Sequence, residues 1–385
     1  MFKNGNSFPK IMLLALVIFV VSAVQPSPFL AQGGGPRIVW ESPISSQLKG
    51  TIYDTVITAG TARVVASAVG QVLQIDEKGT FVTLFRLDDR EVAIVAEEGK
   101  HAGILKFELN SVAAFRVAGL DGKVVVEAKN PDPLASFYRL AARADTFVSL
   151  RRRDHAGLSE IAYRFFDSSG LSKSQEIISP ASQPPVDSAY APDGAAFLIN
   201  QRDGLFSYDP ATVKLRWKIQ KLVRHFAVSN GTIGYAIVSL DGGHEARKIS
   251  ELYKAGNLIW SFTLKENVRN VAISPASEFV LGSDAQRVHA FKPTSGQPVW
   301  SFTVPDGFTI NSVAVNDRGF AAIGAQHSSL TNGIVLVFDA AGKQVFRKDL
   351  QYHESNAFTP TVSFDAIGKS LLIRTEETLA LVAVE

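Results

Sequence analysis

The fold is decided by VAISPASEFVLGSDAQRVHAFKPTSGQPVWSFTV (Val271–Val304), which holds four short β-like runs and three tight turns. Its last run, GQPVWSFTV (Gly296–Val304), nearly repeats GNLIWSFTL (Gly256–Leu264). A unit that recurs after roughly 40 residues, with four strands in each copy, is typical of a β-propeller blade. The sequence therefore predicts one continuous ring of such units, although 385 residues would otherwise suggest several domains.

Composition excludes some classes of protein. Charged residues make up 20% of the chain and there are 25 Phe, which is enough apolar material for a large core and argues against disorder. Without its first 23 residues the chain has 37 basic and 37 acidic residues. Nucleic-acid binding needs a basic surface, so we expect no nucleic-acid partner. Cys is absent, which excludes disulfides, thiolate metal sites and lipidation at Cys.

Residues 1–23 have the pattern of an export signal. Lys3 and Lys10 precede an unbroken apolar run, Ile11–Val21, which is short for a membrane span of ~20 residues. Val21 and Ala23 fit the small-residue positions before a cleavage site. We expect a periplasmic or secreted protein, and the alternative is an uncleaved N-terminal membrane anchor. Residues 24–35, rich in Pro and Gly, are predicted to form a linker.

A second mark of the repeat is a turn between the last two strands of each unit, which often reads D-x-x-G or K-x-x-G. Asp accepts hydrogen bonds from nearby backbone donors, and Gly adopts the positive φ that closes the turn. The strand after the turn carries a large residue at one phase, which we predict fills the space between neighbouring units. The turn recurs at 76–79, 121–122, 167–170, 209–210, 254–256, 292–296 and 339–342. The large residues are Trp40, Trp217, Trp260, Trp300 and Phe346.

Another turn recurs between the first two strands, at 191–194, 229–231, 274–277, 316–319 and 365–368. The turn at 191–194 has the sequence Ala-Pro-Asp-Gly. In this turn the chain resembles the WD40-like and quinoprotein-like family of β-propellers, whose blades carry S-P-D-G turns in this place. The resemblance covers about residues 36–385. It implies an all-β propeller of four-stranded blades, and it says little about function because this fold hosts many activities.

The two ends of the chain predict how the ring closes. The C-terminal Thr378–Glu385 aligns with a third strand and has no fourth after it, whereas Pro36–Pro43 aligns with a fourth strand. We therefore expect the N-terminal strand to complete the last blade and remove an exposed edge. Counting third strands favours eight blades. Seven is the alternative, because residues 134–178 form the least regular unit.

Catalytic motifs are absent from the sequence: it has no G-x-S-x-G, H-E-x-x-H, Walker-type loop or G-x-G-x-x-G before a helix. Quinone-dependent dehydrogenases share the eight-blade plan, but no acidic set stands out as a calcium site here. We expect no cofactor, no metal site and no catalytic residues.

Polar residues gather in the loops that join the second strand to the third, or the fourth strand to the next blade. In propellers of this family these loops lie on one face. Five of the seven histidines map there or to the loop edges: His155, His225, His244, His327 and His353. The candidate partner-binding residues are Arg151, Arg152, Arg153, His155, Arg202, Asp203, Asp241, His244, Asp284, His327 and Arg374. The alternative is that these loops are polar only because they are solvated.

These observations favour a non-catalytic, exported, monomeric scaffold that binds a protein, peptide or glycan of the cell envelope through this face. The alternative is a propeller enzyme with its site at the channel mouth, either a quinone-dependent dehydrogenase or a metal-dependent lactonase or hydrolase. The enzyme would need convergent acids or histidines around the axis.

Overall fold

A computed structural model describes residues 35–44, 52–58, 63–96, 100–108, 111–129, 137–140, 146–155, 158–167, 172–180, 188–201, 203–231, 234–351, 359–365 and 367–384. The predicted signal peptide and residues 24–34 of the predicted linker lie outside these ranges. No helix in the described ranges is long and apolar enough to cross a membrane.

The described residues form eight antiparallel sheets of four strands each, numbered here sheet 1 to sheet 8. Sheet 1 contains β2 (Ile52–Ile57), β3 (Val64–Ala68), β4 (Gln71–Ile75) and β5 (Phe81–Arg86), and sheet 2 contains β6 (Glu91–Val95), β7 (His101–Glu108), β8 (Ser111–Gly119) and β9 (Val124–Lys129). Sheet 3 contains β10 (Phe137–Leu140), β11 (Thr146–His155), β12 (Leu158–Asp167) and β13 (Ser172–Pro180). Sheet 4 contains β14 (Ser188–Tyr190), β15 (Phe197–Gln201), β16 (Gly204–Tyr208) and β17 (Leu215–Ile219). Sheet 5 contains β18 (Val223–Val228), β19 (Tyr235–Leu240), β20 (Ile249–Lys254) and β21 (Asn257–Thr263), and sheet 6 contains β22 (Asn270–Ile273), β23 (Val280–Ser283), β24 (Arg287–Phe291) and β25 (Pro298–Thr303). Sheet 7 contains β26 (Phe308–Val315), β27 (Ala321–His327), β28 (Asn332–Phe338) and β29 (Gln344–Gln351). Sheet 8 contains β30 (Thr361–Phe364), β31 (Ser370–Arg374), β32 (Thr378–Ala383) and β1 (Arg37–Pro43). A short 3-10 helix, η1 (Ala246–Lys248), precedes β20.

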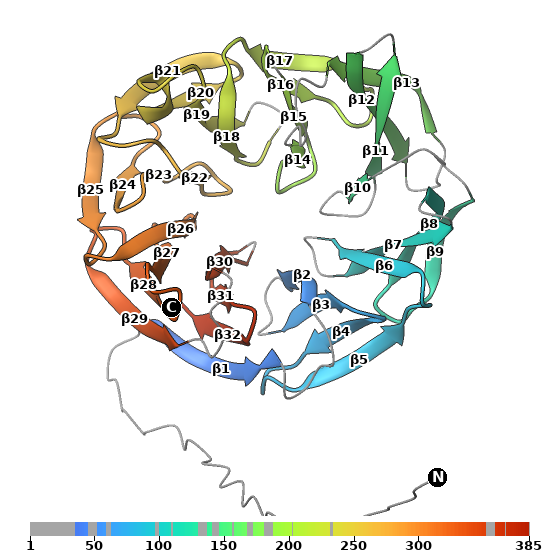
Figure 1. The fold of residues 1–385 in the computed structure, drawn as a ribbon, viewed down its shortest axis with the longest axis horizontal. Helices are drawn as coiled ribbons and strands as arrows, with labels where there is room; N and C mark the ends of the chain where they lie inside the picture. Colours follow the sequence, from blue (N-terminus) through green and yellow to red (C-terminus); the bar gives the residue numbers. More distant parts are fainter. Residues whose placement is uncertain are drawn as a thin grey trace, which may run out of the picture. The chain divides into compact units, whose positions relative to one another are not determined.

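The sheets follow one another around a ring, with the first strand of each sheet innermost and the fourth outermost (Figure 1). The all-β propeller expected from the sequence is confirmed, and the eight sheets agree with the eight-blade interpretation. The irregular stretch that favoured seven blades forms the complete four-stranded sheet 3.

Sheet 8 joins the two ends of the chain. β1 pairs antiparallel with β32, from Arg37 opposite Ala383 to Pro43 opposite Thr378. This pairing agrees with the predicted closure, because the N-terminal strand takes the outermost place that every other sheet fills with its own fourth strand.

The apolar core lies between neighbouring sheets, which explains why the middle strands are apolar at nearly every position. Side chains alternate between the two faces of a strand. In β23, Val280 packs in the cluster shared with sheet 5, and its neighbour Leu281 packs in the cluster shared with sheet 7. In β24, Phe291 and Ala290 divide in the same way. Both faces of these strands are therefore buried, as in parallel sheets covered on both sides.

Five large residues of outermost strands pack against the glycine of the next sheet's turn between its third and fourth strands; Phe346 has no such partner, because the third and fourth strands of sheet 8 are the two ends of the chain. A Cβ built on Gly342 would lie 2.5 Å from Cγ of Trp300, and one built on Gly296 would lie 3.0 Å from Cβ of Trp260. Gly296 lacks a positive φ, so close approach alone requires glycine there. The same contact joins Trp40 to Gly79, Phe85 to Gly122 and Trp217 to Gly256. The sequence prediction that these rings fill the space between units agrees with this packing, although it missed Phe85.

The outermost strands have irregular register beside these large residues. Ala290 pairs with Trp300 and Phe291 with Pro298, so Val299 is an extra residue in β25. Val299 is 50% exposed, and Ile259, at the same place in β21, is 44% exposed. Such bulges bend an edge strand and disrupt its ladder, so they oppose pairing with another chain even where the edge is apolar.

A second set of contacts joins the turns between the first two strands of neighbouring sheets. Each contact uses a turn residue to satisfy a backbone group of the next turn, so the sheets are fixed to one another at this end as well as through the core. The bonds run from Gly231 N to Asp193 Oδ2 (2.7 Å), from Asn230 N to Pro275 O (2.8 Å), from Ala276 N to Asp317 Oδ1 (2.7 Å) and from Asn316 Nδ2 to Gly368 O (2.6 Å).

The packing of Trp300 predicts the effect of Gly342→Ala. The positive φ of +82° costs an L-residue about 1–2 kcal/mol, and displacing the ring adds about 1–3 kcal/mol. Gly70→Ala is the matched control, because Gly70 has a φ of +70° and nothing within 4 Å of the added Cβ. Urea unfolding should show the larger loss for Gly342→Ala. Equal losses for the two variants would contradict the packing account.

Asp365 predicts a pH-dependent stability. It is buried, its Oδ1 accepts from the backbone N–H of Lys369 (2.7 Å), and its Oδ2 accepts no hydrogen bond from the described residues. Burial raises the pKa of Asp365 above 3.8, against the opposing effect of backbone N–H donors. The folded protein therefore holds this proton more tightly than the unfolded chain, and stability is lost as pH rises through the raised pKa.

We expect Asp365→Asn to raise the melting temperature at pH 7 and to lose this advantage as the pH falls toward 4. Asn316 is the natural precedent, since its Oδ1 accepts from Phe320 N in the equivalent turn. The reciprocal Asn316→Asp should destabilise at pH 7 by about 1 kcal/mol or more, because it buries a charge and loses the donor to Gly368 O. A lower melting temperature for Asp365→Asn at pH 7 would refute this account.

Candidate binding face

The loop face is the end of the ring where the second strand of each sheet joins the third and the fourth strand joins the next sheet. Because each sheet is antiparallel and its strands follow in sequence order, apart from β1 as the fourth strand of sheet 8, these two kinds of loop lie at the same end of the strands. In sheets 5 to 7 the loop face includes residues 241–248, 264–269, 284–286 and 304–307. Backbone hydrogen bonds join these loops, for example from Val268 N to Arg247 O (2.7 Å) and from Ile310 N to Ala285 O (2.7 Å).

Some of the candidate partner-binding residues lie in strands, where the sequence analysis expected loops. Arg151–His155 belong to strand β11, where Arg152 pairs with Ile161 and Arg153 with Glu160, and not to a loop. The hairpin is longer than the turn signals indicated, because charged residues continue its ladder. Their side chains lie outside the described part of the chain, as do Arg202 and His353. His225 lies within the inner strand β18, where its backbone N donates to Ser239 Oγ (3.1 Å).

Asp241 and His244 lie in the loop before β20, with the charges of that loop paired to one another. Arg247 Nε donates to Asp241 Oδ1 (2.8 Å), and Lys248 Nζ donates to Glu245 Oε1 (3.0 Å). The hydrogen bond and charge of Lys248 lower the pKa of Glu245. His244 is exposed beside them. This loop presents charged groups to solvent in a fixed arrangement.

Asp284 is buried and has a structural task within its own loop. Its Oδ1 accepts from the backbone N–H of Gln286 (2.9 Å) and of Arg287 (2.7 Å), which closes the turn between β23 and β24. Behind this turn, burial first and the charge of Arg287 second lower the pKa of His289, whose Nδ1 lies 2.6 Å from Ser301 Oγ. The sequence interpretation of Asp284 as an exposed partner contact did not anticipate this burial.

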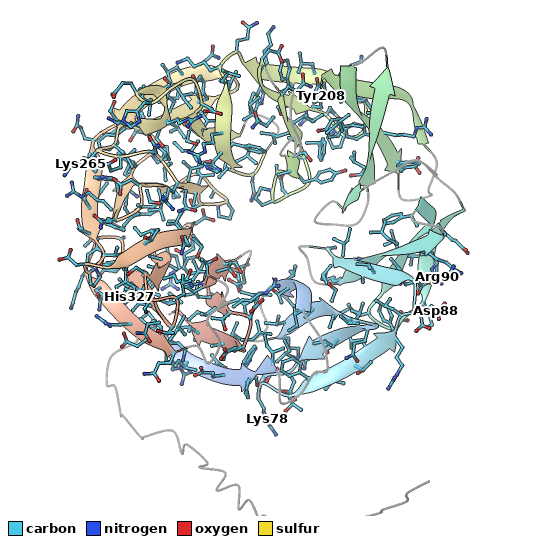
Figure 2. All side chains as sticks on the ribbon, in the orientation of Figure 1. Lys78, Asp88, Arg90, Tyr208, Lys265 and His327 are labelled. Carbon is cyan, nitrogen blue, oxygen red and sulfur yellow. The ribbon has the colours of Figure 1, made fainter. Side chains whose placement is uncertain are left out.

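His327 ends β27 and packs within its own sheet (Figure 2). Its ring lies edge-on to Phe308, with centroids 5.0 Å apart, and its Nδ1 accepts from the backbone N–H of Ser329 (3.1 Å). Asp203, by contrast, is exposed in the turn between β15 and β16. Asp203 and His244 are therefore the candidates whose side chains are exposed without a described role in holding the fold.

Arg374 links the last sheet to the first. Its Nη2 donates to the carbonyl oxygen of Ile52 in β2 at 2.6 Å. The described contact is thus a tether across the seam where the ring closes.

A hollow of ≈ 420 Å³ lies on the loop face of sheet 6, beside the connection from sheet 5 to sheet 6 and Thr309 of β26. Asp284 is the one predicted site residue that lines it. The others were missed because they lie on two loops far apart in the sequence, 265–269 and 284–287, and on the ends of two strands, and no motif joins them. The lining residues are Lys265, Glu266, Asn267, Arg269, Asp284, Ala285, Gln286, Arg287, Thr303 and Thr309. Lys265 is labelled in Figure 2, toward the outer side of the ring beside β25.

The predicted residues come from different sheets, and the described structure does not bring them into one cluster. Within the described ranges, no three His, Asp or Glu side chains are grouped so that they could hold a metal ion. The enzyme alternative needed such a convergence and gains no support from this part of the chain.

Comparisons with known proteins agree with the fold. A family model described as outer membrane protein assembly factor BamB matches residues 167–319, less than half of the chain. The C-terminal WD40 domain of Sif2 superposes with a TM-score of 0.61 at 11% identity, covering 91% of this chain and 99% of that chain. KlHsv2 with loop 6CD replaced by a Gly-Ser linker has a TM-score of 0.52 at 10% identity, covering 80% and 100%. No curated protein sequence matches. The WD40-like and quinoprotein-like resemblance is confirmed for the fold.

The tether of Arg374 predicts a loss of stability for Arg374→Gln. Removing a charged donor from a backbone carbonyl costs about 1.5–3 kcal/mol. Asp203→Ala, an exposed change on the same face, should stay within about 0.5 kcal/mol. Guanidinium unfolding of both variants measures the difference, and wild-type stability in Arg374→Gln would remove the tether from the account.

Proposed function

We propose that this protein is an exported, non-catalytic scaffold of the cell envelope that binds a partner protein through its loop face. The observation that carries the proposal is the construction of that face: backbone bonds fix the loops, while polar and charged side chains such as His244, Lys265 and Arg269 remain exposed. A surface already ordered before binding loses little conformational entropy on association.

The envelope location rests on two independent supports. Residues 1–23 have the composition of an export signal. The matching family model is described as an outer membrane protein assembly factor, and an assembly scaffold is the particular form of function that this match favours. A propeller suits such a role because its ring tolerates varied loops on a constant frame.

Site-specific photo-crosslinking in the envelope tests which face binds. A photoreactive amino acid replaces exposed His244 on the loop face, and the matched control replaces exposed Lys343 in the turn between β28 and β29. We expect a discrete crosslinked protein from position 244 and none from position 343. Crosslinks from position 343 alone would refute the proposed face.

Metal analysis and an ultraviolet–visible spectrum of the purified protein test the non-catalytic part of the proposal. We expect no stoichiometric metal and no quinone chromophore. Either one would overturn the scaffold in favour of a propeller enzyme.

A further inference from the structure

We propose that the hollow on the loop face of sheet 6 binds an acidic peptide segment of a partner protein, an inference that rests on the proposed scaffold function and specifies the chemistry of its partner. The cations Lys265, Arg269 and Arg287 line this hollow and are exposed. A carboxylate is the group that exposed ammonium and guanidinium donors pair with most readily among protein side chains.

The lack of ion pairs at these cations distinguishes the hollow from the neighbouring loop. In the neighbouring loop before β20, Arg247 is paired with Asp241 and Lys248 with Glu245. Lys265, Arg269 and Arg287 form no ion pair with any described residue, and the one described hydrogen bond of the Arg287 guanidinium runs from Nε to Thr303 Oγ1 (3.2 Å). Guanidinium and ammonium donors are therefore left for a ligand.

The three cations of the hollow outnumber its two carboxylates, Asp284 and Glu266, and neither carboxylate forms an ion pair with a described cation. Asp284 is buried, and its Oδ1 is occupied by the backbone N–H groups of Gln286 and Arg287. Glu266 is exposed on the wall beside Lys265. A negative side chain here disfavours a compact dianion such as phosphate more than a single carboxylate, because repulsion grows with ligand charge.

Asn267 favours a peptide over a simple anion. Its Oδ1 is buried and receives no hydrogen bond from a described residue, although Asn267 lines the hollow. A buried acceptor without a donor is costly. A carboxylate ion supplies no donor to satisfy it and hydrogenphosphate supplies only an O–H, whereas a peptide backbone supplies an N–H at nearly every residue. The side chains of Gln286, Thr303 and Thr309 supply further hydrogen-bonding groups on the walls.

The hollow is also formed before any ligand arrives. Arg269 N donates to Ser283 O (2.7 Å), and Val304 N donates to Gln286 O (2.9 Å). These bonds fix the two loops that carry Arg269 and Gln286, so the cations project from an ordered backbone and binding needs little reorganisation.

Fluorescence polarisation with a labelled hexaglutamate peptide tests the inference on the purified mature protein at low salt. The double variant Lys265→Gln/Arg269→Gln removes two cations of the hollow. Arg90→Gln is the matched control, because Arg90 is exposed on the loop face between β5 and β6 (Figure 2). We expect at least about tenfold weaker binding in the double variant, since one charged hydrogen bond of about 1.5 kcal/mol corresponds to a factor of ten. The Arg90→Gln protein should bind within about twofold of wild type, because rim charges contribute little.

Two further measurements separate a peptide from an anion. Asn267→Ala removes the acceptor without changing charge and should weaken peptide binding by roughly threefold or more. Inorganic phosphate should compete only at concentrations far above that of the peptide. Labelled hexaglutamine should bind at least tenfold more weakly than hexaglutamate, because it lacks the carboxylates.

Equal affinity of the double variant and wild type would overturn the inference, as would equal binding of hexaglutamine or displacement by equimolar phosphate. Melting temperatures of all variants exclude unfolding as the cause of a loss. If peptide binding fails while position 244 still crosslinks a partner, the acidic-peptide inference is wrong and the scaffold function stands. If position 244 also fails, the proposed function falls with it.

Discussion

The contact between an outer-strand aromatic ring and the glycine of the next sheet's turn is the constraint on which the structure depends. It recurs from Trp300 to Gly342, from Trp260 to Gly296 and, across the closing seam, from Trp40 to Gly79. A ring of separate sheets has no chain-wide ladder of hydrogen bonds, so the sheets are held by side chains packed between them. Any Cβ at these glycines would push neighbouring sheets apart. The N-terminal strand matters for the same reason, since its pairing with β32 completes sheet 8 and places Trp40 against Gly79 of sheet 1.

This arrangement places most of the stabilising contacts away from the loop face. The core clusters, the aromatic contacts and the first-turn hydrogen bonds lie elsewhere, and the bond from Arg374 to Ile52 is an exception on the loop face. The loops of that face can therefore carry unpaired charge without weakening the ring, because exposed charges contribute little to folding. Under the proposed function, binding rather than folding sets the composition of these loops, and the paired loop at Asp241 and the unpaired hollow at Arg269 show the contrast that the proposal uses.

Repetition explains what could be predicted from the sequence. Turn residues such as Asp339 and Gly342 and rings such as Trp300 recur in the chain, so each copy supports the interpretation of the others. The closure could be predicted because the C-terminal end aligned with a third strand and the N-terminal end with the fourth strand that was missing there. Candidate site residues occur once each. Burial of Asp284 and the tether of Arg374 to Ile52 depend on contacts between segments far apart in the sequence, and no local pattern reports such contacts. The hollow was missed because it is formed by two loops from different sheets, each unremarkable alone.

Amide hydrogen exchange of the mature protein, free and bound to the partner that crosslinking isolates, tests most directly the claim that a rigid ring presents one recognition face. The account predicts slower exchange on binding in loops 241–248 and 264–269, with exchange unchanged in the turns at 292–297 and 339–342. Protection confined to those turns, or a loss of protection in the strands around Trp300, would contradict it.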